Sequence, residues 1–490
     1  MTVVVNRRSD FTLDNFRRVA FEGEGVEIGP VARGAMAAAR RGFVALLDSD
    51  RSAFIYGTTT RPGIEVSTPV PPERQREYAR SFRAHTGLGF GGGCHDEQIV
   101  RGMVFARLAD FVEGHAKVRP DVADRVAALL GSPLPCVPLG GQAGPGEILP
   151  MLHLMAAVEG LDLEEGEGMA LINGSPYSTA VLADTAVRAK HRLAHAELVF
   201  ALAIDAFRAP LDAYDEALED LWDDPYQVAA LRSLRAHLAG AGASGRLAHQ
   251  APVSFRIVPR LAGEARRAVA QAGQAAATAL RSVSVNPVYL PPDPGHPLGR
   301  VASNGGFHNA SACPALQALS ASWAELALAA ERQAAAFHRG AAYGLPHLLS
   351  PPGYSGVVHG ATSLFGWVAT GYAESARAAA APALMPAVLV DTQNDLATAT
   401  SLAHDKQRRA ADGLDGALAI LALVASQALF VTGREPAPPL AGLVAGLRSV
   451  FPPVDRPDGR DQGAQAGQLA EVFRAGAVTG QLAFLPPGKR

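Results

Sequence analysis

Residues 137–154, VPLGGQAGPGEILPMLHL, decide how this chain is interpreted. Four of the first ten residues in this stretch are glycine, the residue that best tolerates tight turns and left-handed backbone. The part from Glu147 onward indicates the start of a helix, because an acidic residue suits the positive end of a helix and Pro150 is tolerated only early in one. The stretch therefore predicts a glycine-rich loop that runs directly into a helix.

The composition favours a mainly α-helical protein with a large core. The chain has 490 residues, of which 48% are hydrophobic and only 6% are aromatic. Alanine, leucine and glycine dominate, whereas strands mostly use β-branched and aromatic residues. A chain of this length can bury several cores' worth of apolar surface, so we expect a folded helical body and no extended disorder.

Hydrophobic periodicity divides the chain into three parts. We predict a loop-rich N-terminal part over residues 1–180, a central helical bundle over 181–433, and a C-terminal surface loop with a short helix over 434–490. The surface loop is expected over 434–467, where prolines and charged residues are frequent. The predicted bundle helices cover residues 187–207, 262–282, 313–339, 361–381 and 396–431.

Charge and cysteine content argue against several classes of partner. The net charge of −3 is spread along the chain without a basic stripe, so nucleic-acid binding is not expected. Cys94, Cys136 and Cys313 are scattered and odd in number, which favours a reduced, cytoplasmic protein with no disulfide and no metal site. We expect no signal peptide, because the first twenty residues carry charges and few apolar residues, and the longest apolar run, 417–431, falls short of the roughly 20 residues that cross a bilayer. We expect no membrane partner.

Several motifs, in order along the chain, resemble those of the histidine and phenylalanine ammonia-lyase family. The 140–153 segment is similar to the signature GSVGASGDLAPLAH, and residues 171–175, LINGS, are similar to LLNGT. The other similar segments are YGTTTRPG (56–63, for YGINTGFG), RAHTGLG (83–89, for SHAAGVG), PVSFR (252–256, for PYSLR), SVNP (284–287, for SDNP), SNGGFH (303–308, for SGGNFH) and TQND (392–395, for NQED). The resemblance implies an ammonia-lyase-like fold and, for assembly, a homotetramer.

One departure from the family pattern concerns its prosthetic group. Family members cyclise an Ala-Ser-Gly triplet into the electrophile methylideneimidazolone, and the resemblance places Gly144, Pro145 and Gly146 at that triplet. Pro145 has no β-hydroxyl to eliminate, so the dehydroalanine half of the group cannot form. We therefore predict that this cofactor is absent and that the chain uses no cofactor.

The resemblance also implies which residues form a site for a small-molecule substrate. Tyr56 corresponds to the general base of the family, and His85 lies within one position of a pocket histidine, so both are candidate catalytic residues. Arg256 corresponds to the arginine that grips a substrate carboxylate, a role that suits a planar guanidinium, although a structural ion pair is equally plausible. The other predicted substrate-binding residues are Asn173, Phe307, Tyr177, Val253 (a tyrosine in the family) and Asn394 (a glutamate in the family).

These residues favour an enzyme that performs acid/base chemistry without the electrophile. A substrate with its own activating carbonyl does not need methylideneimidazolone, and helix N-termini favour an oxyanion that develops on it. We therefore predict addition, cyclisation, elimination or isomerisation on a carbonyl-activated molecule of specialised metabolism. Two alternatives remain open: a noncatalytic homologue that binds a ligand or a partner subunit, and residual ammonia-lyase or aminomutase activity.

Overall fold

The computed structural model describes residues 1–82, 87–158, 161–242, 244–354, 362, 364–383 and 393–484. Within these ranges the protein is mainly helical, as predicted, and its strands form two small two-stranded sheets. The first elements are β1 (Thr2–Val5), α1 (Leu13–Ala20), β2 (Gly25–Ile28), α2 (Pro30–Ser49), α3 (Gln75–Ser81), α4 (Glu97–Phe111), α5 (Pro120–Ala128), α6 (Ile148–Met155), α7 (Glu167–Ile172) and α8 (Pro176–Phe207). They are followed by α9 (Leu218–Trp222), α10 (Pro225–His237), α11 (Val253–Arg256), α12 (Val258–Arg281), β3 (Val288–Leu290), β4 (Arg300–Ala302), α13 (Ala312–His338), α14 (Phe365–Ala379), α15 (Thr400–Val431), α16 (Ala441–Val450) and α17 (Gln462–Thr479).

The chain forms two compact units, each built from segments that are distant in sequence. Unit 1 contains Met1–Val187, Ala272–Leu316 and Ala383–Asp405, and unit 2 contains Arg188–Gln271, Gln317–Pro382 and Lys406–Arg490. The sequence predicts three consecutive parts. The observed division differs from that prediction, because most of the unit boundaries fall inside long helices. The predicted boundary after residue 180, for example, lies within α8.

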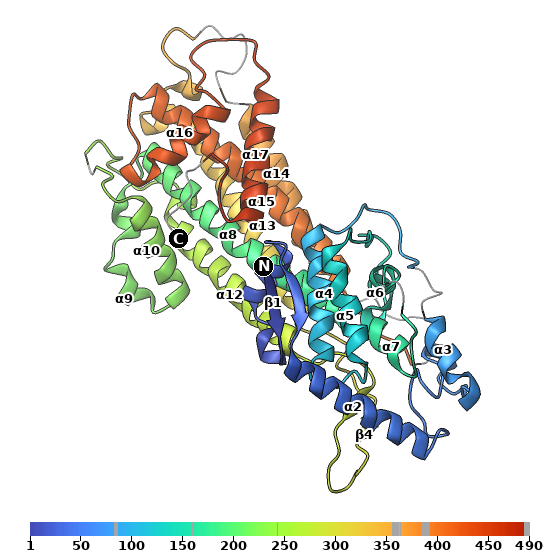
Figure 1. Cartoon of the computed structure of the whole chain (residues 1–490). Helices are drawn as coiled ribbons and strands as arrows, with labels where there is room; N and C mark the ends of the chain where they lie inside the picture. Colours follow the sequence, from blue (N-terminus) through green and yellow to red (C-terminus); the bar gives the residue numbers. More distant parts are fainter. Residues whose placement is uncertain are drawn as a thin grey trace. The chain divides into compact units, whose positions relative to one another are not determined.

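Unit 1 is organised around α4, whose residues from Ile99 to Phe111 are all buried. It packs against α1 and α5, while α7 packs against α3 and α6 (Figure 1). β1 pairs in parallel with β2, so that Thr2 lies opposite Gly25. A helix that is buried on every side needs apolar neighbours all round, and this central position of α4 places its polar residues in the interior of the unit.

Local sequence explains where several helices begin. The side chain of Thr12 accepts a hydrogen bond from Asn15 N at the start of α1, and Asp224 accepts from Tyr226 N and Gln227 N at the start of α10. These short polar side chains satisfy N–H groups that have no partner inside the helix. α2, α5 and α10 also begin with a proline, which is preorganised for the first helical position.

The bundle helices that periodicity predicts are all present. The largest difference is α8, which begins eleven residues earlier than predicted, because Pro176 starts a helix through a stretch rich in serine and threonine. Among the described residues, α15 is the one helix long and apolar enough to cross a membrane. However, 89% of its most apolar window is buried inside the structure, as in the core helix of a globular fold.

Two predictions from the sequence are wrong. Cys94 and Cys136 form a disulfide, with Cα atoms 5.3 Å apart, and only Cys313 is free. Pairing was missed because the two cysteines are brought together by non-local backbone contacts, including the hydrogen bond from His95 N to Val137 O. The expected surface loop over 434–467 contains α16, whose apolar face is buried, and α17 begins inside it.

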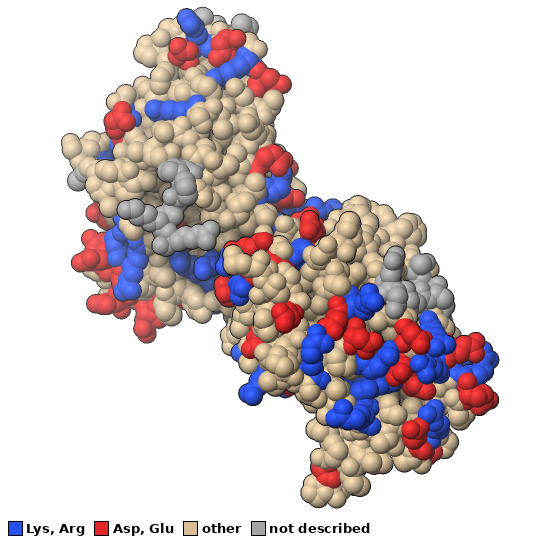
Figure 2. All heavy atoms as spheres, in the orientation of Figure 1, with Lys and Arg blue, Asp and Glu red and all other residues tan. Residues whose placement is uncertain are grey.

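Charged side chains of both signs are mixed on the surface. On the face shown in Figure 2, basic and acidic residues lie next to one another, and no area of that face is uniformly basic. Ion pairs between solvent-accessible side chains include Arg33–Asp124, Arg51–Asp48 and Arg74–Glu77. Exposed pairs of this kind contribute little to stability, typically about 0–1 kcal/mol each.

Candidate active site

The glycine-rich loop ends in a turn with left-handed backbone. Gly144 has φ 125° and Gly146 has φ 65°, conformations that favour glycine. Glu147 follows with φ 52°, which is uncommon for a residue with a side chain, and α6 then begins at Ile148, as the sequence predicts. The backbone N–H of Gly174 donates a hydrogen bond of 3.2 Å to the carbonyl oxygen of Gly146. This bond fastens the turn to the segment that carries Asn173.

Three of the predicted site residues meet at this turn. A Cβ atom built at Gly146 lies 3.0 Å from Asn173 Nδ2 and 3.7 Å from Phe307 Cδ2. The other atom of the same amide, Asn173 Oδ1, accepts a hydrogen bond of 3.1 Å from Asn286 N. This bond directs the amide nitrogen towards the turn. Gly146, Asn173 and Phe307 therefore form one cluster, although they are far apart in the sequence.

Tyr56 and Asn394 approach a second turn. The hydroxyl of Tyr56 accepts a hydrogen bond of 3.1 Å from Gly63 N. A Cβ built at Gly63 lies 3.5 Å from Asn394 Nδ2, and the side chain of Gln393 donates to Gly63 O. Gly63 therefore contacts Tyr56, the candidate base, and the segment that contains Asn394.

A cavity of about 580 Å³ lies beside both turns. Its lining includes Arg61 and Pro62, between Tyr56 and Gly63, and also Ile148 and Ile172, which adjoin Glu147 and Asn173. Phe82, Leu152 and Ile172 make part of the wall apolar, and burial raises the pKa of Tyr78, another lining residue, to about 12. This volume is within the range of sites that enclose small organic ligands.

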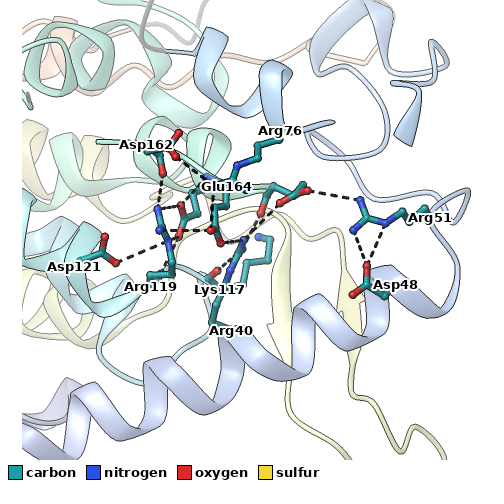
Figure 3. A network of polar contacts seen from close by, with 11 residues as sticks. Arg40, Asp48, Arg51, Arg76, Lys117, Arg119, Asp121, Asp162 and Glu164 are labelled. Atoms are coloured by element: carbon teal, nitrogen blue, oxygen red, sulfur yellow. Dashed lines mark hydrogen bonds and ion pairs between the residues drawn. The ribbon is translucent and has the colours of Figure 1, made fainter. Parts of the chain in front are cut away.

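A polar network supports the segment that leads into Asn173 (Figure 3). The carboxylate of Glu167, the first residue of α7, accepts hydrogen bonds from Arg119 N, Arg119 Nε and Glu164 N, each 2.9–3.0 Å long. Glu164 in turn pairs with Arg40 of α2 at 3.0 Å. Because α7 ends at Ile172, this network holds the start of the short helix that positions Asn173.

Lys117 occupies the interior beneath the same network. Its Nζ donates a hydrogen bond of 2.7 Å to Pro287 O and lies 5.8 Å from the centre of the Phe43 ring. Burial lowers the pKa of Lys117 to about 7, and the neighbouring Arg40 cation lowers it further in the same direction. Sequence alone gave no signal for this residue, because lysine is usually exposed.

Tyr177 lies away from the cavity wall. It is buried, and its hydroxyl lies 3.3 Å from His95 Nε2. The ring of His95 stacks on His404, with the ring centres 5.5 Å apart. Burial raises the pKa of Tyr177 above its usual value. The residue therefore belongs to a buried polar cluster, and its role in shaping the substrate cavity stays a prediction.

Val253 and Arg256 belong to unit 2, on the short helix α11. Val253 is 57% exposed and lines a mostly apolar groove of about 510 Å³ together with Ile257 and Leu328. Arg256 Nε donates a hydrogen bond of 3.0 Å to Ala251 O. No ion pair of Arg256 occurs among the residues that the structure describes. The other N–H groups of the guanidinium have no acceptor among the described contacts. They can therefore donate to another group.

Two further predictions concern catalysis and metals. His85 lies outside the described residues, and its catalytic role stays a prediction. Among the described residues, no group of three or more histidine, cysteine, aspartate or glutamate side chains is arranged to hold a metal ion. Sequence reasoning also missed the burial of Glu147, which it assigned only to the first turn of a helix.

Comparison with known proteins gives a consistent set of relatives. The family model for aromatic amino acid lyases matches residues 11–162 and 155–449. A histidine ammonia-lyase from Streptomyces coelicolor is 28% identical over 98% of this chain and 100% of its own length. Another from Deinococcus radiodurans is 29% identical over 70% of each chain.

Solved structures with the same fold cover almost the whole chain. The ergothioneine-degrading enzyme ergothionase from Treponema denticola has a TM-score of 0.87 and 17% identity, with 98% of this chain and 99% of that chain covered. Tyrosine aminomutase from Streptomyces globisporus has a TM-score of 0.83 and 23% identity, with 98% of each chain covered. At these identities the likeness concerns the fold alone.

Proposed function

This chain belongs to the aromatic amino acid lyase family, and we propose that it is a member that performs acid/base chemistry without the family's prosthetic group. Its substrate in this proposal is a small molecule that carries its own activating carbonyl. The reaction is an addition, cyclisation, elimination or isomerisation next to that carbonyl. The observation that carries the proposal is Pro145 at the centre of the turn beside Asn173 and Phe307.

The residues of the turn do not fit methylideneimidazolone. Forming that ring requires the third residue's amide nitrogen to attack the first residue's carbonyl carbon, with loss of water that takes the N–H proton of the middle residue. A second loss of water takes the hydroxyl of the middle residue. Pro145 has neither a backbone N–H nor a hydroxyl, so both steps lack a reacting group. We therefore derive no step through this cofactor.

The remaining residues support acid/base chemistry. Tyr56 is the proposed base: it takes a proton from the carbon next to the substrate carbonyl, or from the nucleophile that adds to the double bond. The amide N–H of Asn173 holds the carbonyl oxygen, which becomes an enolate oxygen as the proton leaves. Protonated Tyr56 then returns the proton, so the base is regenerated without an external reagent. Phe307 packs against the apolar part of the ligand.

The relatives support a fold that serves several substrates. Its relatives include histidine ammonia-lyases, a tyrosine aminomutase and an enzyme that degrades ergothioneine. Changes at Pro145, Val253 and Asn394 remove groups that the family uses for amino acids. A more apolar ligand than histidine is consistent with these losses and with the apolar wall of the cavity.

Assembly is the second part of the proposal. We expect a homotetramer, in which exposed apolar side chains on unit 2 are covered by sister chains. Val253 and Trp367, which are 57% and 73% exposed in the single chain, support this expectation. Large apolar side chains in contact with solvent commonly mark protein interfaces.

The test uses aromatic enones such as benzylideneacetone, together with their β-hydroxyketone hydration products, and follows the enone absorbance in both directions. Tyr56→Phe is expected to lower turnover at least about a hundredfold, as is usual when a general base is lost. Tyr78→Phe is the matched control, because Tyr78 is a tyrosine that lines the cavity, and turnover should fall less than about tenfold. Full activity of Tyr56→Phe would contradict the assignment of the base.

Two outcomes would favour the alternatives. Release of ammonia from histidine, phenylalanine or tyrosine at high enzyme concentration would show residual lyase activity and would overturn the proposal. Tight binding of enones without turnover of any substrate in the panel would favour a noncatalytic ligand-binding homologue.

A further inference from the structure

The carboxyl group of Glu147 reaches the first residues of α8. Its Oε2 accepts a hydrogen bond of 2.8 Å from Ser178 N, and the neighbouring Tyr177 N–H favours the charged form of the same carboxyl. The first N–H groups of a helix have no partner inside the helix, and the N-terminus carries partial positive charge. Glu147 therefore caps the 32-residue helix α8 from a distant part of the chain.

The surroundings of this carboxyl are fully buried. Glu147 is 4% exposed, and the nearest cation is Arg107 of α4, which is 0% exposed. Arg107 Nη1 donates to Asp110 Oδ2 at 3.0 Å, and Arg107 Nη2 lies 2.9 Å from a Cβ built at Gly174. Among the described residues, neither Glu147 Oε1 nor Arg107 Nη2 has a hydrogen-bond partner. A buried polar atom without a partner is uncommon and needs a functional or structural reason.

Two separate contacts connect the turn to the segment 173–178. One is the backbone bond from Gly174 N to Gly146 O, and the other is the hydrogen bond from Ser178 N to the carboxyl of Glu147. Glu147 makes the second contact from left-handed backbone, with φ 52°. Such a conformation is strained for a residue with a side chain and persists where surrounding contacts hold it.

We propose that Glu147 is a positioning residue of the candidate site: its carboxyl fixes the turn on the start of α8 and so holds Gly146 against the amide of Asn173. Only the ligand-binding role of Asn173 rests on the proposed function. The connection between the turn and α8 does not depend on it.

Burial raises the pKa of Glu147 to about 8, against the opposing effects of the Ser178 and Tyr177 N–H groups and of Arg107. The other groups around it are Asp110, which pairs with Arg107, and the phenol of Tyr177. Because a neutral carboxyl group also accepts a hydrogen bond from an N–H group, the positioning role does not require the charge.

Amide hydrogen exchange of the full-length protein tests the positioning role without any ligand. In Glu147→Ala, the amides of Tyr177 and Ser178 should exchange at least tenfold faster than in the unchanged protein. Glu147→Gln should stay within threefold, because its amide oxygen still accepts from Ser178 N. Glu197→Ala is the matched control. Glu197 is a buried glutamate, as Glu147 is, but it lies within α8 and is bonded to Ser233 and Arg266. It should leave Tyr177 and Ser178 within threefold.

Two results would overturn the positioning role. One is unchanged exchange at Tyr177 and Ser178 in Glu147→Ala, and the other is an equal acceleration in Glu197→Ala, which would indicate a general loss of stability. If Glu147→Ala does not fold, Glu147→Asp replaces it. The shorter aspartate should also accelerate exchange at these two amides at least threefold, and normal protection would contradict the proposal.

Discussion

The backbone N–H of Gly174 donates to the carbonyl oxygen of Gly146 across 3.2 Å. This single bond joins two turns that lie 28 residues apart in the sequence, and both carry residues of the candidate site. On one side is the turn that contains Gly144, Pro145 and Gly146, and on the other is Asn173. In the proposed function, Asn173 holds the carbonyl oxygen of the ligand.

Gly146→Ala tests this close approach. Gly146 has φ 65°, and an added Cβ lies 3.0 Å from Asn173 Nδ2, so the amide must move by a few tenths of an ångström. We expect a loss of about 1–2 kcal/mol of unfolding free energy from the backbone conformation, together with about tenfold weaker binding of benzylideneacetone. Gly91→Ala is the control, because Gly91 has φ 87° but nothing within 4 Å of the added Cβ. Equal effects on binding in both variants would rule out a contact at Asn173.

Lys117→Met tests the buried amine by its pH dependence. The pKa of Lys117 in the folded protein is about 7, below its ordinary value of 10.5. The contribution of Lys117 to the free energy of unfolding is therefore fully present above pH 10.5. It is lost as the pH falls through 7, because the folded protein must then bury a charge. Methionine has no charge, so Lys117→Met should gain stability relative to the unchanged protein as the pH falls.

Urea unfolding of both proteins at pH 6, 8 and 10 measures this difference. One pKa unit corresponds to about 1.4 kcal/mol, so the relative gain of the methionine variant between pH 10 and pH 6 should reach several kcal/mol. Parallel stability curves for the two proteins would show that Lys117 keeps its ordinary pKa.

The disulfide between Cys94 and Cys136 predicts a thiol count. The denatured, unreduced protein should show one reactive thiol, from Cys313, and the reduced protein should show three. The bond closes a segment of 42 residues, and loop-closure entropy then contributes roughly 4 kcal/mol to stability. Reduction should therefore lower the melting temperature. Three thiols before reduction would mean that the two cysteines are not paired.

Arg256 is expected to bind a carboxylate when the assembled protein meets its ligand. A charge-assisted hydrogen bond contributes about 1.5–3 kcal/mol, so Arg256→Leu should weaken trans-cinnamate roughly 10- to 100-fold. Methyl cinnamate should bind both proteins alike, because its ester has no charge to pair. Equal weakening of acid and ester would instead assign Arg256 a structural role. Calorimetric titration of both ligands distinguishes these results.

Much of the fold was accessible from the sequence, since alanine- and leucine-rich periodicity predicts α8, α12, α13, α14 and α15. Part of the site was also accessible: the family resemblance singles out Gly146, Asn173 and Phe307, which meet in space. What the sequence did not predict depends on non-local contacts. Glu147 looks like an ordinary acid in a first helical turn, and only the folded chain brings it to α8.

The disulfide and α16 have the same kind of explanation. Cys94 and Cys136 pair because two irregular segments run side by side, which no local pattern encodes. α16 lies between proline-rich segments that suggested a loop, yet burial of Leu443, Val444 and Leu447 stabilises the helix. In both cases tertiary packing outweighed the local sequence signal.

Mass spectrometry of the peptide that contains Gly144, Pro145 and Gly146 tests the central claim most directly. We predict the mass given by the sequence, with unmodified proline at the centre of the turn and no near-ultraviolet absorbance beyond that of the aromatic residues. A peptide lighter by the mass of one or two water molecules, accompanied by new near-ultraviolet absorbance, would show that an electrophile forms here and would contradict the account.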